Sequence, residues 1–173
     1  MKQHITNKLF NNINIIYSLL TVMNTFVSIC TPTFNRRYHL KGLIECIKLQ
    51  TYPKHLIQWV ICDDGTDDVS DIFQNLNDTI CLKEIKYFRC ENFTPLGSKR
   101  NLMNQQCTGD IIVNMDDDDY YPPERIEHAV STLLNNPDIM LVGSSIMYLY
   151  SSVNKRSEEH TSELQSPDYL VCR

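Results

Sequence analysis

Several features that would mark a special class of protein are scarce or missing in this sequence. It contains no CxxC pair and no GxxxxGK[ST] motif, so neither a cysteine-held metal centre nor a P-loop is predicted. Only five glycines and seven prolines occur in 173 residues, which excludes collagen-like and low-complexity chains. The formal charge of -5 argues against a basic nucleic-acid-binding surface, so we expect no nucleic acid partner.

The chain also lacks a long apolar run. Its apolar-leaning N-terminal stretch, residues 13–23, is shorter than the roughly 20 apolar residues that span a membrane. It also lacks the clean apolar core and small-residue cleavage site of a signal peptide. We therefore interpret residues 1–24 as an N-terminal extension and expect no transmembrane segment. With the cysteines interpreted as reduced core or surface residues, this indicates a cytoplasmic protein.

From residue 26 onward, short apolar runs alternate with helical spacing. The clearest helix places Leu40, Leu43, Ile44 and Ile47 on one face. Further helices are expected at residues 69–76, at 97–107 with Ser98 as N-cap, and from residue 122. Strands are expected at residues 26–31, 57–62, 82–88, 110–115 and within 139–150. This alternation predicts one α/β domain with a mostly parallel sheet covered by helices on both faces.

Polar clusters follow three of the expected strands, at residues 31–36, 63–68 and 116–119. In open parallel sheets, ligands bind beyond the carboxyl ends of the strands. The three clusters therefore predict a single site at one edge of the sheet, formed by segments that are far apart in the sequence.

The acidic run Asp116-Asp117-Asp118-Asp119 is the sharpest of these clusters. Close carboxylate pairs repel by about 3 kcal/mol at an effective dielectric near 20, so a half-buried run requires a cation. In an extended chain, Asp116 and Asp118 share one face and can form a partial shell for a hard divalent ion, Mn²⁺ or Mg²⁺. The alternative is a solvated acidic turn.

Five motifs in a fixed order, VSICTPTFNR, QTYP, WVICDDGTDD, GSKRN and GDIIVNMDDDDYYPP, resemble those of family 2 glycosyltransferases of GT-A fold. The resemblance covers residues 26–150. It implies a Rossmann-like nucleotide-diphospho-sugar transferase that binds a UDP- or GDP-sugar with a divalent metal. It also implies inverting transfer of the sugar to an acceptor that the sequence does not identify.

The resemblance assigns site residues by position. Thr31, Pro32, Thr33 and Asn35 would line the nucleobase pocket, and Asp64 would hydrogen-bond the base with Asp63 beside it.

Further along the chain, the DxD motif of the family maps to Asp116 and Asp118, which would contact the ribose and the metal, and Asp119 completes the acidic run. Lys99 and Arg100, at the start of a helix, would face the donor and offset its negative charge. Their alternative role is that of ordinary solvated helix residues.

Residues 156–173, RSEEHTSELQSPDYLVCR, look like the translation of a sequencing adapter joined to a shortened reading frame. The alternative is a disordered polar tail. On the first interpretation, residues 25–155 form an incomplete donor-binding domain. Similar family members carry the general base in a later segment, so we expect the base to be missing and this chain to be inactive.

Other functions fit the residues less well. A phosphatase with a DxDGT motif would need an acid where Cys62 stands, and an EF-hand loop starting at Asp116 would need glycine at Tyr121. A nucleotidyltransferase of related fold and a non-catalytic divalent-cation-binding module stay open as alternatives.

Overall fold

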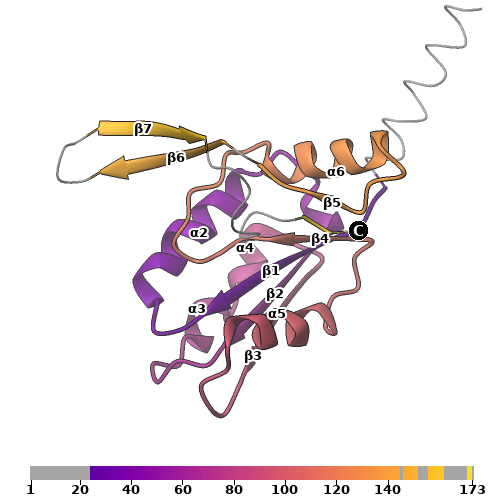
Figure 1. Cartoon of the computed structure of the whole chain (residues 1–173). Helices are drawn as coiled ribbons and strands as arrows, with labels where there is room; N and C mark the ends of the chain where they lie inside the picture. Colours follow the sequence, from indigo (N-terminus) through magenta and orange to yellow (C-terminus); the bar gives the residue numbers. More distant parts are fainter. Residues whose placement is uncertain (1–23, 145, 152–155, 162–170, 173) are drawn as a thin grey trace, which may run out of the picture.

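Two fully buried strands, β1 (Val27–Thr33) and β2 (Ile57–Asp63), pair in parallel at the centre of the sheet. Their apolar residues point to both faces of the sheet, which agrees with burial on both faces. β3 (Glu84–Arg89) lies parallel to β2, and β4 (Ile111–Asn114) lies parallel to β1 (Figure 1). The predicted parallel α/β sheet is thereby confirmed.

The computed structural model describes residues 24–144, 146–151, 156–161 and 171–172. The apolar stretch at residues 13–23, and with it almost all of the expected N-terminal extension, lies outside these ranges. The expected strand within 139–150 is confirmed by β5 (Leu141–Val142) and most of β6 (Ile146–Ser151).

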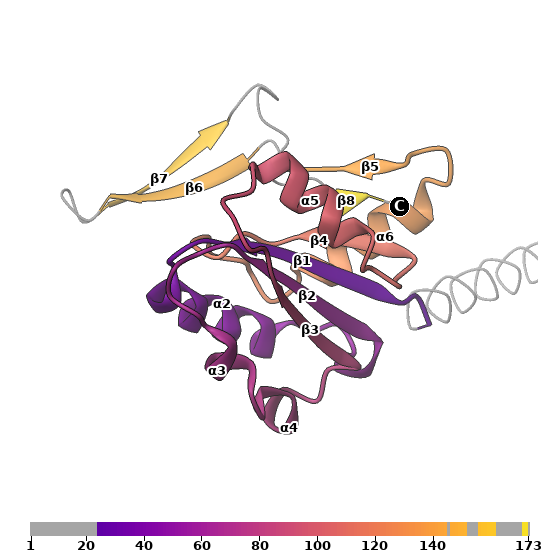
Figure 2. The same cartoon turned by 90° about the horizontal axis from the view of Figure 1, so that it is seen from below.

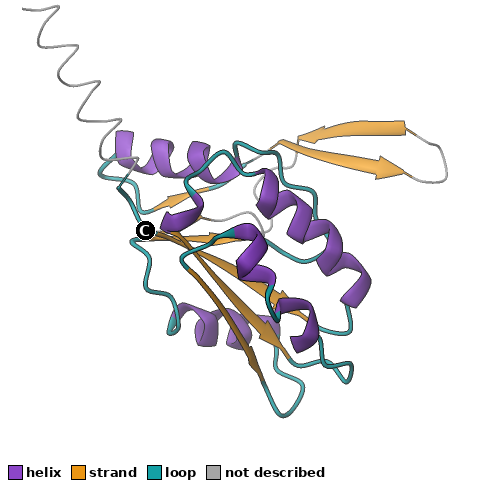
Figure 3. Ribbon diagram, turned by 180° about the vertical axis from the view of Figure 1, so that it is seen from behind, coloured by secondary structure: helices purple, strands orange, loops and turns teal. Residues whose placement is uncertain are grey.

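The second edge of the sheet contains antiparallel pairing. β8 (Val171–Cys172) lies between β4 and β5 and pairs antiparallel with both, giving the order β3-β2-β1-β4-β8-β5. β6 pairs with β7 (Arg156–Thr161) in a separate hairpin that projects from the sheet (Figure 3). The foreign origin of residues 156–173 stays a prediction.

Helices cover both faces of the sheet, as predicted. α2 (Arg37–Leu49), α3 (Ser70–Phe73), α4 (Leu76–Ile80) and α6 (Arg125–Asn135) cover one face, and α5 (Leu96–Asn104) covers the other (Figure 2). A short 3-10 turn, Lys54–Leu56, leads into β2.

Side chains along each strand point alternately to the two faces of the sheet, and each face has its own hydrophobic core. Val27 and Ile29 of β1 point to the larger core with α2 and α6, whereas Cys30 joins Met103 of α5 in the smaller one. All four predicted apolar residues of α2 are buried, which confirms that helix face.

Some predicted boundaries were wrong. β1 and β2 continue to Thr33 and Asp63, so each includes the first polar residues of its cluster. β4 ends at Asn114 although the Met115 N–H still donates to the Cys30 carbonyl over 3.0 Å, because the chain then leaves the sheet and turns at residues 117–118.

The predicted helix N-cap was also wrong. Ser98 lies inside α5, whose N-cap is Pro95, and no side chain caps that end. The ring of Pro95 fixes φ just before the first turn, and the helix begins at Leu96, three residues earlier than a cap at Ser98 predicts. The expected helix at residues 69–76 is instead divided into α3 and α4.

Candidate active site at the carboxyl edge of the sheet

Thr33, at the end of the central strand β1, connects the acidic segments that follow β2 and β4. Its hydroxyl donates to Oδ2 of Asp117 over 2.7 Å. Its carbonyl accepts from Nζ of Lys99 over 3.0 Å and from the Asp64 N–H over 3.4 Å. The three polar clusters predicted from the sequence therefore meet at one edge of the sheet.

Asp64 and Lys99 form a buried ion pair at this edge. Asp64 Oδ1 lies against the Lys99 ammonium group, and its Oδ2 accepts from the Thr94 N–H over 2.7 Å. Both residues are less than a tenth exposed. Charges removed from water in this way require close pairing and further hydrogen bonds, and both carboxylate oxygens have a partner here.

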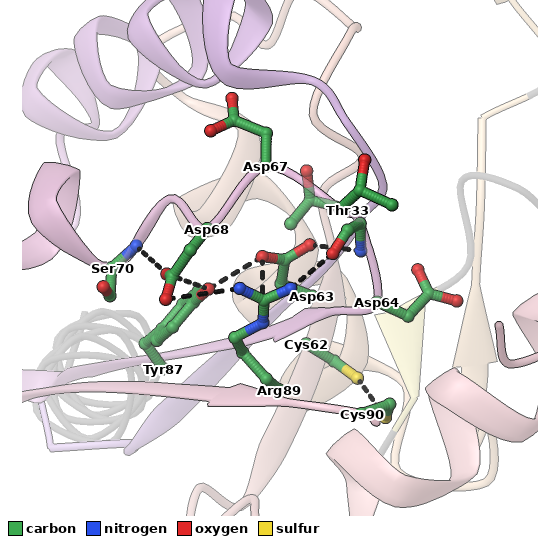
Figure 4. A network of polar contacts seen from close by, with 12 residues as sticks. Thr33, Cys62, Asp63, Asp64, Asp67, Asp68, Ser70, Tyr87, Arg89 and Cys90 are labelled. Atoms are coloured by element: carbon green, nitrogen blue, oxygen red, sulfur yellow. Dashed lines mark hydrogen bonds and ion pairs between the residues drawn. The ribbon is translucent and has the colours of Figure 1, made fainter. Parts of the chain in front are cut away.

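Asp63 is buried beside Asp64 in a separate network (Figure 4). Its Oδ1 accepts from the Gly65 N–H over 2.8 Å, and its Oδ2 accepts from the Tyr87 hydroxyl over 2.7 Å. Burial and the bond to Asp63 raise the pKa of Tyr87, so the phenol stays a donor. Asp63 therefore fixes the start of the loop after β2.

The rest of this loop is held from the opposite side. Oδ1 of Asn35 accepts from the N–H groups of Thr66 and Asp67 over 2.8 and 3.1 Å. Arg37 binds both oxygens of Asp67 over 2.8 and 3.0 Å, and this fork lowers the pKa of that carboxyl. A Cβ on Gly65 would lie 2.6 Å from the Asn35 nitrogen, so only glycine fits there.

Thr31 and Pro32 are buried within β1. The Thr31 hydroxyl donates to the Met115 carbonyl over 2.8 Å and accepts from Nε1 of Trp59 over 2.9 Å. Thr31 therefore joins the ends of β1 and β4 inside the sheet. The assignment of these two residues to a nucleobase pocket stays a prediction.

The acidic run after β4 is not extended, and the expected alternation of faces was wrong. Because the chain turns at residues 117–118, Asp117 points to Thr33 while the exposed Asp118 pairs with Arg36 over 2.5 Å. Asp116 pairs with Arg100 over 3.2 Å.

Two arginines thus offset part of the repulsion within the run, and one carboxyl group of the run is buried. Burial raises the pKa of Asp117, and the hydrogen bond from Thr33 partly opposes this shift. Asp119 lies 3.5 Å from the Tyr121 hydroxyl.

The donor chemistry of Asp116 and Asp118 fits a hard divalent cation. Within the described residues, no group of three or more His, Cys, Asp or Glu side chains is arranged to hold a metal ion. Mg²⁺ and similar ions often take only one or two protein carboxylates, with substrate phosphates completing the shell. The assignment of Asp116 and Asp118 to such a metal stays a prediction.

Sequence reasoning missed several contributors. Arg36, Arg37 and Arg89 each pair with an acid at this edge, and Phe93 packs edge-on against Phe34 with ring centroids 6.1 Å apart. Arg36 and Arg37 directly follow the motif TPTFN, so two adjacent basic residues at the end of an expected strand were the available signal. Phe93 carried no such signal, because its loop has no periodic pattern.

Helices of the described segments are all too short or too polar to cross a membrane.

Residues 28–170 match the family described as "Glycosyl transferase family 2". The chain is 30% identical to a Campylobacter jejuni GalNAc(5)-diNAcBac-PP-undecaprenol beta-1,3-glucosyltransferase, over 85% of this chain and 48% of that protein. It is 31% identical to a Haloferax volcanii glucosyl-dolichyl phosphate glucuronosyltransferase, over 72% and 39%.

Solved structures show the same fold. A Pyrobaculum calidifontis mannosyltransferase in complex with GDP-Man and Mn²⁺ superposes with a TM-score of 0.63 at 21% identity, covering 69% of this chain and 35% of that one. Staphylococcus aureus TarS in complex with UDP-GlcNAc gives 0.58 at 25% identity, covering 65% and 32%. The chain spans about half the length, or less, of these proteins.

Proposed function

Because the chain belongs to glycosyl transferase family 2, we propose that it is the donor-binding part of an enzyme that transfers a sugar from a nucleotide-diphosphate sugar. The observation that carries the proposal is the convergence on Thr33 of the acidic segments after β2 and β4. Such a strand-end site suits a ligand with a base at one end and a charged diphosphate at the other.

Base recognition is assigned to the ends of β1 and β2. Uracil and guanine both present ring N–H donors, and Asp64 supplies a carboxylate acceptor whose position is fixed by Lys99 and the Thr94 N–H. Asp63 and Asn35 would act indirectly, since their side chains hold the loop that follows Asp64. The donor is therefore a UDP- or GDP-sugar in this proposal.

The diphosphate is assigned to the end of β4. Asp116 and Asp118 would hold Mn²⁺ or Mg²⁺, which when bound supplies positive charge to the departing diphosphate. Arg100 and Arg36, now paired with these two aspartates, would contribute further positive charge. We assign no general base among these acids, and we propose inversion at the anomeric carbon in line with family membership.

Calorimetric titration of UDP and GDP, each with and without Mn²⁺, tests the proposal. Asp116→Asn and Asp118→Asn should each lower the Mn²⁺-dependent affinity at least about tenfold, because each removes a metal ligand. Asp78→Asn is the matched control, since it removes an exposed acid from α4 on one outer face and should leave the affinity unchanged.

Equal Mn²⁺-dependent affinity in the wild type and both site variants would contradict the metal assignment. Binding of Ca²⁺ alone, with no effect of nucleotide, would favour the cation-binding module instead. Tight binding and turnover of a nucleoside triphosphate, but not of a nucleotide sugar, would favour the nucleotidyltransferase.

A further inference from the structure

Four cysteines gather on the face of the sheet that α5 covers. They form two sulfur–sulfur contacts, Cys30 with Cys107 at 3.3 Å and Cys62 with Cys90 at 3.4 Å. The partners in each pair come from separate segments, so the sequence alone gives no CxxC signal for either contact. Cys46 and Cys81 take part in neither contact.

The two pairs differ in the burial and the pKa of their thiols. Cys107 is only partly buried, and a hydrogen bond from the Cys30 thiol lowers the pKa of Cys107, with smaller help from Ser28 and Lys86 against the opposing effect of burial. Burial raises the pKa of Cys62 to about 12. Because the thiolate is the nucleophile in thiol chemistry, Cys107 should react before Cys62.

We propose that Cys107 and Cys30 form a peroxide-sensitive dithiol, with Cys107 as the partly accessible reacting thiol and Cys30 as the buried thiol that resolves it. Their sulfurs are already in contact at 3.3 Å. An approach of roughly 1.2 Å would reach the bond length of a disulfide. This proposal does not depend on the proposed transferase function.

The chemistry balances with hydrogen peroxide as the oxidant. The Cys107 thiolate attacks one peroxide oxygen, the O–O bond breaks, and water leaves after protonation, giving a sulfenic acid on Cys107. The Cys30 sulfur then attacks the Cys107 sulfur, the S–O bond breaks, and a second water leaves. Two thiols are oxidised to one disulfide while one peroxide is reduced to two waters.

The bond would join two distant parts of the chain. The residues are 77 positions apart, one in β1 and one just beyond α5, the helix that carries Lys99 and Arg100. Closing so long a loop restricts the unfolded chain, so the oxidised form should melt roughly 5–15 °C higher than the reduced form. Oxidation would thus fix the base of α5 to the sheet.

Peptide mapping of the full chain tests the proposal. After treatment with hydrogen peroxide and alkylation of the remaining thiols, digestion without reductant should release a peptide pair joined through Cys30 and Cys107. Cys30→Ser should leave Cys107 as a sulfenic acid that dimedone traps. Cys81→Ser removes an exposed thiol outside both contacts and should give the wild-type map.

Three results would overturn the proposal. They are full alkylation of Cys107 after peroxide, overoxidation of Cys107 without a link to Cys30, and a link from Cys107 to another cysteine. The wild-type map decides among these outcomes even if Cys30→Ser fails to fold, because it requires no substitution in the core.

Discussion

The acids after β2 and those after β4 lie at the same edge of the sheet, yet they are stabilised in different ways. Asp63 and Asp64 are buried, and their oxygens receive backbone N–H groups, a phenol and an ammonium group. Asp116 and Asp118 instead face single arginines from two different elements. The first segment is therefore preorganised by the fold, whereas the second is held by ion pairs that a cation would have to replace at the proposed metal site.

The buried Lys99–Asp64 pair should give the largest effect of any single change at this edge. Lys99→Met keeps the length of the side chain but leaves a buried carboxylate without its counterion and removes one of the two hydrogen bonds to the Thr33 carbonyl. Removing one partner of a buried ion pair costs about 3–5 kcal/mol, so the free energy of unfolding should fall by that amount. Urea denaturation at pH 7 measures it.

The control for this prediction removes both charges together. Lys99→Met combined with Asp64→Asn should recover a large part of the loss, because no uncompensated charge then stays buried. A double variant as unstable as Lys99→Met alone would show that packing, and not charge, accounts for the loss.

On the β4 side we expect a smaller effect from the bond between Thr33 and Asp117. Thr33→Val keeps the shape of the side chain but removes the donor to a buried carboxylate, which costs about 1–3 kcal/mol of unfolding free energy. Thr33→Ser keeps the hydroxyl and should cost less in the same urea titration. If the valine and serine variants were equally stable, the hydrogen bond would contribute nothing.

Most of the fold was predictable from the sequence because the spacing of the apolar residues agrees with their burial in the helices and strands. Leu40 and its three partners in α2 were identified from spacing alone, and β1 and β2 were recognised as short, mainly apolar runs. The N-terminus of α5 was wrong because Ser98 has a favourable cap chemistry, but Pro95 already fixes the preceding backbone. The predicted start of α5 was therefore wrong where the cap preference of a serine competed with the backbone preference of a proline.

The candidate site was predictable in its place but not in its contacts. Topology alone brings Asp64 and Asp116 to one edge once the strands are assigned, which is why their neighbourhood was foreseen. Whether the acidic run turns or extends depends on tertiary partners such as Arg36 and Thr33, and these lie more than 80 residues away. The contact between Cys30 and Cys107 could not be predicted either, because these residues are also far apart in the sequence.

The smallest effect in this comparison concerns Asp68, an exposed acid of the β2 loop. The Ser70 N–H, with help from the Ser70 hydroxyl, Tyr87 and Arg89, lowers the pKa of Asp68 from 3.8 to about 2. Between these values the unfolded chain binds more protons than the folded one, so stability falls as the pH falls. Solvent screening keeps the effect small, because the carboxyl group is exposed.

Wild type should therefore be more stable than Asp68→Asn at pH 7, and this advantage should shrink as the pH falls from about 4 to 2, because only the wild-type carboxylate is protonated there. Urea titrations of both proteins at pH 7, 4 and 3 measure the difference, with Asp78→Asn in α4 reporting the general effect of one lost charge. An advantage that stays constant down to pH 3 would mean that the bonds from Ser70 and Tyr87 stabilise the ionised and the protonated carboxyl group equally. In that case the loop after β2 would be held by other contacts, such as those of Arg37, Asn35 and Asp63, and Asp68 would not contribute to the contrast with the β4 acids.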